Sequence, residues 1–293
     1  MNRLPSLPSF VVLCGVSLIL WMRPLLDTFS LAVNDDRYTQ ILLILPMAVV
    51  LTIQRWWERG GKPQIWTPAA ALLIAALLVA GAARWGHLVE SSDLRLAIEM
   101  LALVGWWIAA FAFSFGLAAL RVCCFPLFFL LCIVPIPLLI LERIVAGLQH
   151  GSAIAAQWLF LLFRVPVVRD GVSLSIPGLD IDVTTECSSV RSSLMLLVTT
   201  MVLAHLLLQH LWRKVVLVLL AVPLSVAKNG LRICTIGMLG SRVDPSYLTG
   251  RLHRKGGIVF FLIALAGIFL VLWILRRGDG VQAPAIKLSP QKS

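Results

Sequence analysis

Long apolar runs separated by short polar segments cover most of this chain. Read with a 19-residue hydropathy window, eight runs approach the length of about 20 residues that crosses a hydrocarbon core roughly 30 Å thick. Unpaired backbone groups cannot face lipid, so these runs are predicted to be helices. The eight predicted spans are residues 8–23, 38–54, 67–84, 96–119, 122–142, 190–209, 214–238 and 256–275. We therefore expect an all-α polytopic membrane protein with about eight transmembrane helices and both termini on one side.

The fifth predicted span and the segment after it break this regular pattern. Pro126, Pro135 and Pro137 are expected to kink the fifth helix. Residues 143–186 then form the only long hydrophilic connection in the sequence. Its first part, 144–163, mixes apolar residues with Gln, His and Ser, which suits an interfacial or partly buried helix.

The second half of this connection reads as β-structure. The sequence VPVVRDGVSLSIPGLDIDV alternates polar and apolar residues around Asp170-Gly171, which predicts a hairpin with strands near 165–169 and 172–176. Pro177-Gly178 indicates a second turn. We expect a small extracytoplasmic β-hairpin element between spans five and six.

Composition supports the membrane class and changes the interpretation of the charge. The chain is 59% hydrophobic and 13% charged, values that exclude an ordinary soluble domain. The formal net charge of +11 would suggest nucleic acid in a soluble protein. Here the Lys and Arg residues lie mostly in short loops and at helix ends, so membrane lipids with anionic head groups are the expected partners, and nucleic acid is not.

Orientation follows less directly, because the positive-inside rule gives a mixed answer. We place the N-terminus in the cytoplasm and expect the run Phe10–Met22 to stay as a first span, since it lacks a small-residue cleavage site. The expected organisation is one integral membrane domain over 1–277, with 143–186 as an extracytoplasmic insertion. Residues 278–293 would form a short basic cytoplasmic tail.

One of the six cysteines stands apart. Cys14, Cys123, Cys124, Cys132 and Cys234 lie in apolar runs without metal-ligand spacing, and are expected to be small buried hydrophobes. The sixth, Cys187, lies in the polar stretch TTECSSVRSS at the start of the sixth span.

At a helix N-terminus, the positive end of the dipole favours a thiolate over a thiol. Arg191, one turn further on, would add to this effect, whereas a charged Glu186 would oppose it. The alternative interpretation is a polar helix start whose serines, Ser188, Ser189, Ser192 and Ser193, provide close helix packing.

Two further polar clusters lie in the last two spans. Lys228, Asn229 and Arg232 follow 14 to 18 residues after Lys214, which puts Arg232 about 27 Å along the helix, near the opposite membrane face. Charges inside a span cost roughly 2.5 to 3.5 kcal/mol each, which favours a functional role, although both cations could snorkel to the interface. Pro223 and Gly230 are expected to loosen this helix.

His253 immediately precedes the eighth span. Because spans six, seven and eight alternate in direction, topology brings Cys187, Arg232 and His253 to one membrane face. These residue types can supply a nucleophile, an oxyanion-stabilising cation and a general acid/base. An ordinary interfacial histidine is the alternative for His253.

Three motifs in this order, ECSSVRSS, PLSVAKNGLRI and LHRKGGIVFF, resemble the exosortase/archaeosortase family over roughly residues 120–275. The resemblance implies a multi-spanning cysteine protease or transpeptidase that acts on exported proteins carrying a C-terminal sorting signal of the PEP-CTERM type. It implies Cys187 as nucleophile, Arg232 as oxyanion-stabilising residue and His253 as general acid/base, a histidine typical of the bacterial members.

The neighbouring polar residues of these clusters are candidate supporting or substrate-binding residues: Glu186, Ser188, Arg191, Lys228 and Asn229. Ser189 stands where the family usually has glycine. No metal and no organic cofactor are expected, the partner is the sorting-signal helix, and the location is the cytoplasmic (inner) membrane, with the active site at its extracytoplasmic face. The oligomeric state stays open.

Two other functions fit the same pattern of charges. A multi-spanning transporter also places charged residues within its spans, although its polar groups gather near the midplane and here they gather near one face. A non-catalytic scaffold for envelope or exopolysaccharide assembly is the second alternative.

Overall fold

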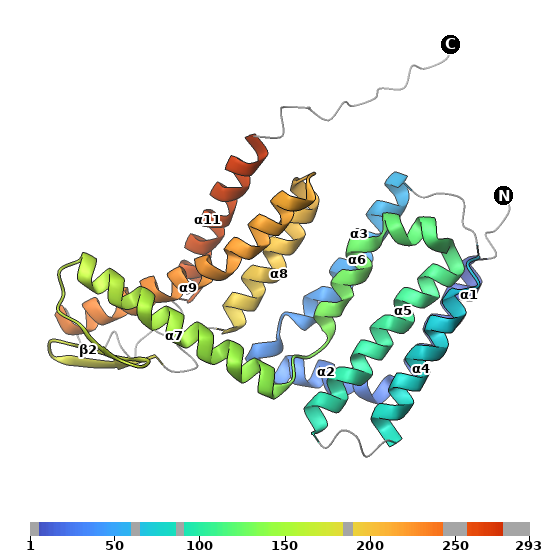
Figure 1. Ribbon diagram of the computed structural model, residues 1–293, viewed down its shortest axis with the longest axis horizontal. Helices are drawn as coiled ribbons and strands as arrows, with labels where there is room; N and C mark the ends of the chain where they lie inside the picture. The colour runs from blue at the N-terminus through green and yellow to red at the C-terminus, as the bar shows by residue number, and fades with distance from the viewer. Residues whose placement is uncertain (1–5, 60–64, 86–90, 184–189, 243–256, 278–293) are drawn as a thin grey trace, which may run out of the picture. The chain divides into compact units, whose positions relative to one another are not determined.

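The computed structural model (Figure 1) describes residues 6–59, 65–85, 91–183, 190–242 and 257–277. Among these residues, six helices are long and apolar enough to cross a membrane, or up to seven if one bent pair counts as a span. The protein is thus a mainly helical, multi-pass membrane protein, with a small antiparallel sheet. The expected number of eight spans is not confirmed among these residues: two predicted spans are shorter apolar helices, Ala69–Trp85 and Cys124–Ile133, and the first is part of the bent pair.

The chain divides into two compact units, residues 1–144 and 145–293, with the boundary inside helix α7. The elements of the first unit, up to and including α7, are α1 (Ser6–Leu20), α2 (Met22–Asn34), η1 (Asp36–Tyr38), α3 (Ile41–Arg59), α4 (Ala69–Trp85), α5 (Ser92–Val122), α6 (Cys124–Phe129), η2 (Leu130–Ile133) and α7 (Leu138–Leu162).

Helix α5 is the centre of the first unit and packs on α1, α2, α3, α4 and α6. Its most extensive partner is α4, and both helices bury alanines, which allow their backbones to approach closely. Two tryptophans of α5 bind α1: Trp106 Nε1 donates to the Leu13 carbonyl at 3.0 Å, and Trp107 Nε1 donates to Ser17 Oγ at 2.9 Å. Indole groups therefore hold α1 against the core by hydrogen bonds as well as by packing.

The first predicted span is a bent pair rather than one helix, because α1 and α2 meet at 73°. Pro24 explains the break: it has no N–H to donate to the Leu20 carbonyl four residues earlier. That carbonyl instead accepts a hydrogen bond from Arg84 Nη2 of α4 at 2.8 Å. The guanidinium of Arg84 also pairs with Glu99 of α5, with 3.0 Å between Nε and Oε2.

The span predicted over 122–142, with a kink at its prolines, is interrupted completely among the described residues. The chain forms the short α6 and η2, leaves the helical conformation at Val134, and starts α7 at Leu138. Pro135 and Pro137 account for this, since proline cannot donate within a helix and disfavours helical geometry in the residue before it. The segment expected as an interfacial helix is part of α7, which is itself long and apolar enough to span a membrane.

The second unit contains the rest of α7, a sheet and three packed helices. Its elements after α7 are β1 (Val168–Asp170), β2 (Ser173–Ile176), β3 (Leu179–Asp182), α8 (Val190–Leu207), α9 (Leu211–Arg242) and α11 (Gly257–Arg277). Helices α8, α9 and α11 all contact one another and enclose an apolar core (Figure 1). These three match the last three predicted spans closely.

The sheet is antiparallel with the order β1-β2-β3, so the predicted hairpin gains a third strand. A two-residue turn with Gly171 at φ 59° joins Asp170 to Ser173, and a second with Gly178 at φ 82° joins Ile176 to Leu179. Both turns need a positive φ at one position, and glycine supplies it without steric cost. The Asp-Gly and Pro-Gly pairs were therefore reliable turn signals.

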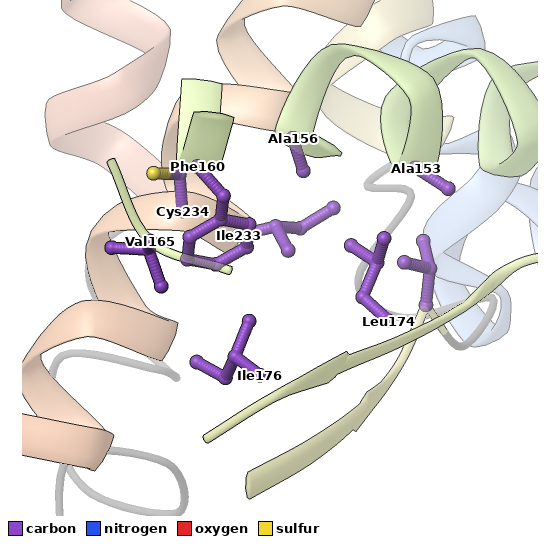
Figure 2. Close-up of a cluster of buried hydrophobic side chains, with 9 residues drawn as sticks. Ala153, Ala156, Phe160, Val165, Leu174, Ile176, Ile233 and Cys234 are labelled. Carbon is purple, nitrogen blue, oxygen red and sulfur yellow. The ribbon is translucent and has the colours of Figure 1, made fainter. Parts of the chain in front are cut away.

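One face of the sheet packs on helices (Figure 2). Leu174 and Ile176 of β2 are buried with Phe160 of α7 and with Ile233 and Cys234 of α9. Alternation along β2 decides this, because side chains two apart share a face. The sheet is thereby fixed to the half of α9 that follows Gly230.

Gly230 of α9 lies in close contact with the backbone of α7. A Cβ at this position would lie 2.6 Å from Ala155 Cβ and 2.9 Å from the Ala156 nitrogen. The prediction that Gly230 and Pro223 loosen the helix was wrong, since α9 runs unbroken from Leu211 to Arg242. Gly230 instead allows two helices to cross in contact.

The five cysteines expected to be buried do not behave alike. Cys123 and Cys234 are buried, Cys14 and Cys132 are half-buried, and Cys124 is exposed. The expectation was wrong for Cys124, because in a membrane protein an apolar run also supplies the surface that faces lipid.

Candidate functional site

A row of buried polar side chains follows one face of α9. Ser225, Lys228, Asn229 and Arg232 have exposed fractions of 2%, 4%, 0% and 8%. Spacings of three and four residues place them above one another on a helix. Because α9 is a membrane-spanning helix, a buried Lys and a buried Arg in it must be solvated by protein groups or water.

The start of α8 supplies polar partners for this row. Ser225 Oγ donates to Ser193 Oγ at 2.6 Å, and the Lys228 ammonium donates to Ser192 Oγ. Ser192 thus lies opposite Lys228 and Ser193 opposite Ser225, so α8 and α9 run antiparallel. Arg232 lies one turn beyond Lys228, in the direction in which α8 begins.

Helix α11 is fixed against α9 in the same antiparallel sense. Arg213 Nη1 donates to the Leu275 carbonyl at 3.0 Å, and a Cβ on Gly267 would lie 3.0 Å from Leu224 Cδ2. Counting from Gly267 and Leu224, Gly257 lies about 15 Å back along α11 and Arg232 about 12 Å forward along α9. Measured along the helix axes, the first residue of α11 and Arg232 therefore lie at the same height to within about one helical turn.

The sheet and α7 hold the chain just before residues 184–189, which lie outside the described residues. Val183 is buried, its N–H donates to the Val172 carbonyl at 3.3 Å, and its carbonyl accepts from Gln149 Nε2 of α7 at 3.0 Å. Val190, the first residue of α8, is also buried. Both ends of the connection between β3 and α8 are therefore anchored in the second unit.

The predicted site residues fall into two groups. Cys187, Glu186, Ser188 and His253 lie outside the described residues, so the structure does not test where they are. The others are described: Lys228, Asn229 and Arg232 are buried on α9, and Arg191 is exposed on the first turn of α8.

Sequence reasoning missed two polar residues that join these elements, Ser225 and Gln149. Ser225 could have been found from its spacing of three residues before Lys228. Gln149 gave no such signal, because its partner is a backbone carbonyl 34 residues away. Within the described part of the chain, no group of three or more His, Cys, Asp or Glu residues could hold a metal ion.

Comparison with protein families decides the classification. Residues 32–270 match the family described as transmembrane exosortase, which is more than half of the chain. The chain belongs to the transmembrane exosortase family. The match runs from the end of α2 into α11, and so includes all of α8 and α9.

Family membership supports, at the level of the family, a membrane protease or transpeptidase that works in protein sorting. In the two other comparisons, no curated protein and no solved structure matches the chain. The resemblance deduced from the three sequence motifs is thus confirmed for the family. The family match assigns no role to any individual residue.

Proposed function

We propose that this exosortase family member is a membrane-embedded cysteine protease or transpeptidase that cleaves the C-terminal sorting signals of exported proteins. Cys187 is the nucleophile, Arg232 stabilises the oxyanion, and His253 is the general acid/base. Glu186, Ser188, Arg191, Lys228 and Asn229 bind substrate or support these three.

The observation that carries the proposal is the register of α8 and α11 along α9. Contacts at Ser192 and Lys228 bring the start of α8 to within about one turn of Arg232, and the contact at Gly267 does the same for the start of α11. Two helices that come from different parts of the sequence thus begin at the level of one buried arginine.

Chain length then limits how far the other two residues can be. Cys187 is three residues before Val190, and His253 is four residues before Gly257. At no more than about 3.6 Å per residue, these distances are at most about 11 Å and 14 Å. Both residues can therefore reach the space next to Arg232 without any change in the described helices.

The proposed reaction proceeds through a thioester. The Cys187 thiol gives its proton to His253, and its sulfur attacks the scissile carbonyl carbon. Arg232 balances the negative charge that develops on the carbonyl oxygen. The C–N bond breaks, and the leaving amine takes the proton back from His253.

A second nucleophile then completes the cycle. Water or an acceptor amine loses a proton to His253 and attacks the thioester carbon, the C–S bond breaks, and the departing Cys187 sulfur takes that proton from His253. The products are a new carboxyl or amide C-terminus and the regenerated Cys187. Hydrolysis and transpeptidation share every step except the identity of this nucleophile.

The proposed location is the inner membrane, with the site at the extracytoplasmic face. The sheet and its connection to α8, within 143–186, lie on that side, and 278–293 form a cytoplasmic tail of the integral domain 1–277. No metal or organic cofactor enters any step. The partner is the substrate's own sorting-signal helix, embedded in membrane lipid.

The decisive test is co-expression with an exported reporter that ends in a short motif, an apolar helix and a basic cluster. Cys187→Ala should abolish the shift in reporter size while the protein stays inserted at wild-type level. Cys234→Ala is the matched control, since it removes a buried thiol of the packed core and should leave processing intact. Normal processing by a stably inserted Cys187→Ala variant would refute the proposal.

A further inference from the structure

A cleft of about 1350 Å³ opens in the first unit, and the proposed reaction makes no use of it. Its walls are the end of α1, helix α2, the last turn of α4 and the first two turns of α5. These four helices lie together in Figure 1. The cleft exists because α1 and α2 bend by 73° at Trp21 instead of continuing as one rod.

Several charges that line the cleft are already engaged by the fold. Arg84 pairs with the almost buried Glu99 and donates to the Leu20 carbonyl that Pro24 leaves without a helical partner. Asp93 Oδ2 accepts the Leu138 N–H at 2.8 Å, at the start of α7. These groups shape the cleft. Because they are already paired within the protein, they would bind a ligand more weakly than unpaired charges.

Three other charges in the lining are exposed: Arg23, Asp27 and Arg95. No hydrogen bond or ion pair joins their side chains to any other residue that the structure describes. Arg23 and Asp27 are one turn apart on α2, on a polar face continued by Ser30 and Asn34. The cleft therefore presents two unengaged guanidinium groups and one unengaged carboxylate.

Exposed apolar side chains also belong to the lining of the cleft. Ile19, Met22 and Leu26 also line it, with exposed fractions of 79%, 60% and 59%. Large aliphatic side chains exposed beside charged groups suit a ligand that is itself amphiphilic. The volume also exceeds the 300 to 1,000 Å³ or so of usual small-molecule pockets.

We propose that this cleft binds a zwitterionic phospholipid that carries a primary amine in its head group. Arg23 and Arg95 hold the phosphodiester, for which the planar guanidinium fork is well suited. Asp27 accepts from the ammonium group, and the acyl chains lie against Ile19, Met22 and Leu26. The two arginines thus pair with the single phosphodiester, and Asp27 pairs with the single ammonium group.

A basic peptide segment is a poorer match for the same surface. Of the three carboxylates in the lining, Glu99 is bound to Arg84 and Asp93 to the start of α7. Only Asp27 is left to receive a peptide cation, beside two arginines that would repel it.

The test uses the full chain purified in detergent and short-chain phosphatidylethanolamine as the probe. Binding is followed by native mass spectrometry and by the shift in unfolding temperature on titration. The double variant Arg23→Gln/Arg95→Gln should raise the dissociation constant roughly a hundredfold, because each of the two lost charge-assisted contacts is worth about a factor of ten. Arg121→Gln, an exposed arginine at the other end of α5, is the matched control and should bind as the wild type does.

Three further arms distinguish the ligand chemistry. Asp27→Asn should remove the preference for phosphatidylethanolamine over phosphatidylglycerol and leave binding of phosphatidylglycerol intact. Inorganic phosphate should not compete at the concentration at which the lipid saturates. Equal binding by the double variant, competition by free phosphate at that concentration, or Asp27-dependent displacement by an oligolysine peptide would each overturn the proposal.

Discussion

Lys228 is the buried cation at which α8 and α9 are joined. Its ammonium donates to Ser192 Oγ, and Ser225 and Ser193 form a second contact one turn away. A hydrogen bond to a charged group contributes about 1.5 to 3 kcal/mol, more than a neutral one. We infer that this polar pair sets the register of the two helices, on which the proposed site depends.

Ser192→Ala should therefore lower the free energy of unfolding by about 1 to 3 kcal/mol, since a buried ammonium loses one acceptor. Thermal unfolding in detergent measures the effect. Ser241→Ala, at the exposed end of α9, is the matched control and should change stability by less than about 0.5 kcal/mol. Equal stability of both variants would show that the Lys228 contact does not hold the helices.

Arg232 has a different predicted role, in catalysis more than in stability. Arg232→Gln should reduce the rate of reporter cleavage about 10² to 10³-fold, the usual effect of removing an oxyanion donor. Arg232→Lys should recover only part of this, because an ammonium lacks the guanidinium fork. Arg242→Gln, exposed at the end of α9, is the control, and unchanged cleavage by Arg232→Gln would exclude an oxyanion role.

Among the elements, the close crossing of α7 and α9 depends on Gly230. Gly230→Ala would place a methyl group 2.6 Å from Ala155 Cβ and against the α7 backbone, so the helices must separate. We expect a loss of about 1 to 3 kcal/mol in stability. Gly147→Ala in α7 meets nothing within 4 Å and should be neutral or stabilising by up to about 1 kcal/mol. Similar unfolding temperatures for the two variants would contradict this account.

The elements also show which signals in the sequence were sufficient. The last three spans and both turns of the sheet followed from hydropathy and from glycine at turn positions, because these are local properties. For the fifth span the prolines predicted a kink, but they did not show that the helix would end completely and that a separate α7 would start at Leu138. The role of Gly230 depends on Ala155, 75 residues earlier, which no local pattern reveals.

The same distinction holds for the candidate site. Sequence alone could select Lys228, Asn229 and Arg232, because charged residues within an apolar span are conspicuous. It could not give the contacts of Ser192 with Lys228, or the level at which α11 begins, since these depend on how three helices pack. The positions of Cys187 and His253 remain predictions from sequence.

For the whole molecule, the proposal requires that the candidate site lie at the extracytoplasmic face of the membrane. The proposal places the loop between α8 and α9 and the end of α9 on opposite membrane faces, since α9 is long and apolar enough to cross between them. In a variant without native cysteines, Ser241→Cys should react with a membrane-impermeant maleimide in intact cells. Gln209→Cys should react only after permeabilisation. The reverse pattern would place the candidate site in the cytoplasm and contradict the proposed action on exported proteins.

The central claim is that catalysis passes through a covalent bond between Cys187 and the substrate, and intact-mass analysis tests it most directly. Protein purified from cells that overexpress the reporter should carry a hydroxylamine-sensitive adduct of the mass of the cleaved reporter, mapped by digestion to the peptide that contains Cys187. The adduct should be absent in Cys187→Ala and retained in Cys234→Ala. Efficient reporter cleavage with no such adduct, or an adduct that persists in Cys187→Ala, would contradict the account.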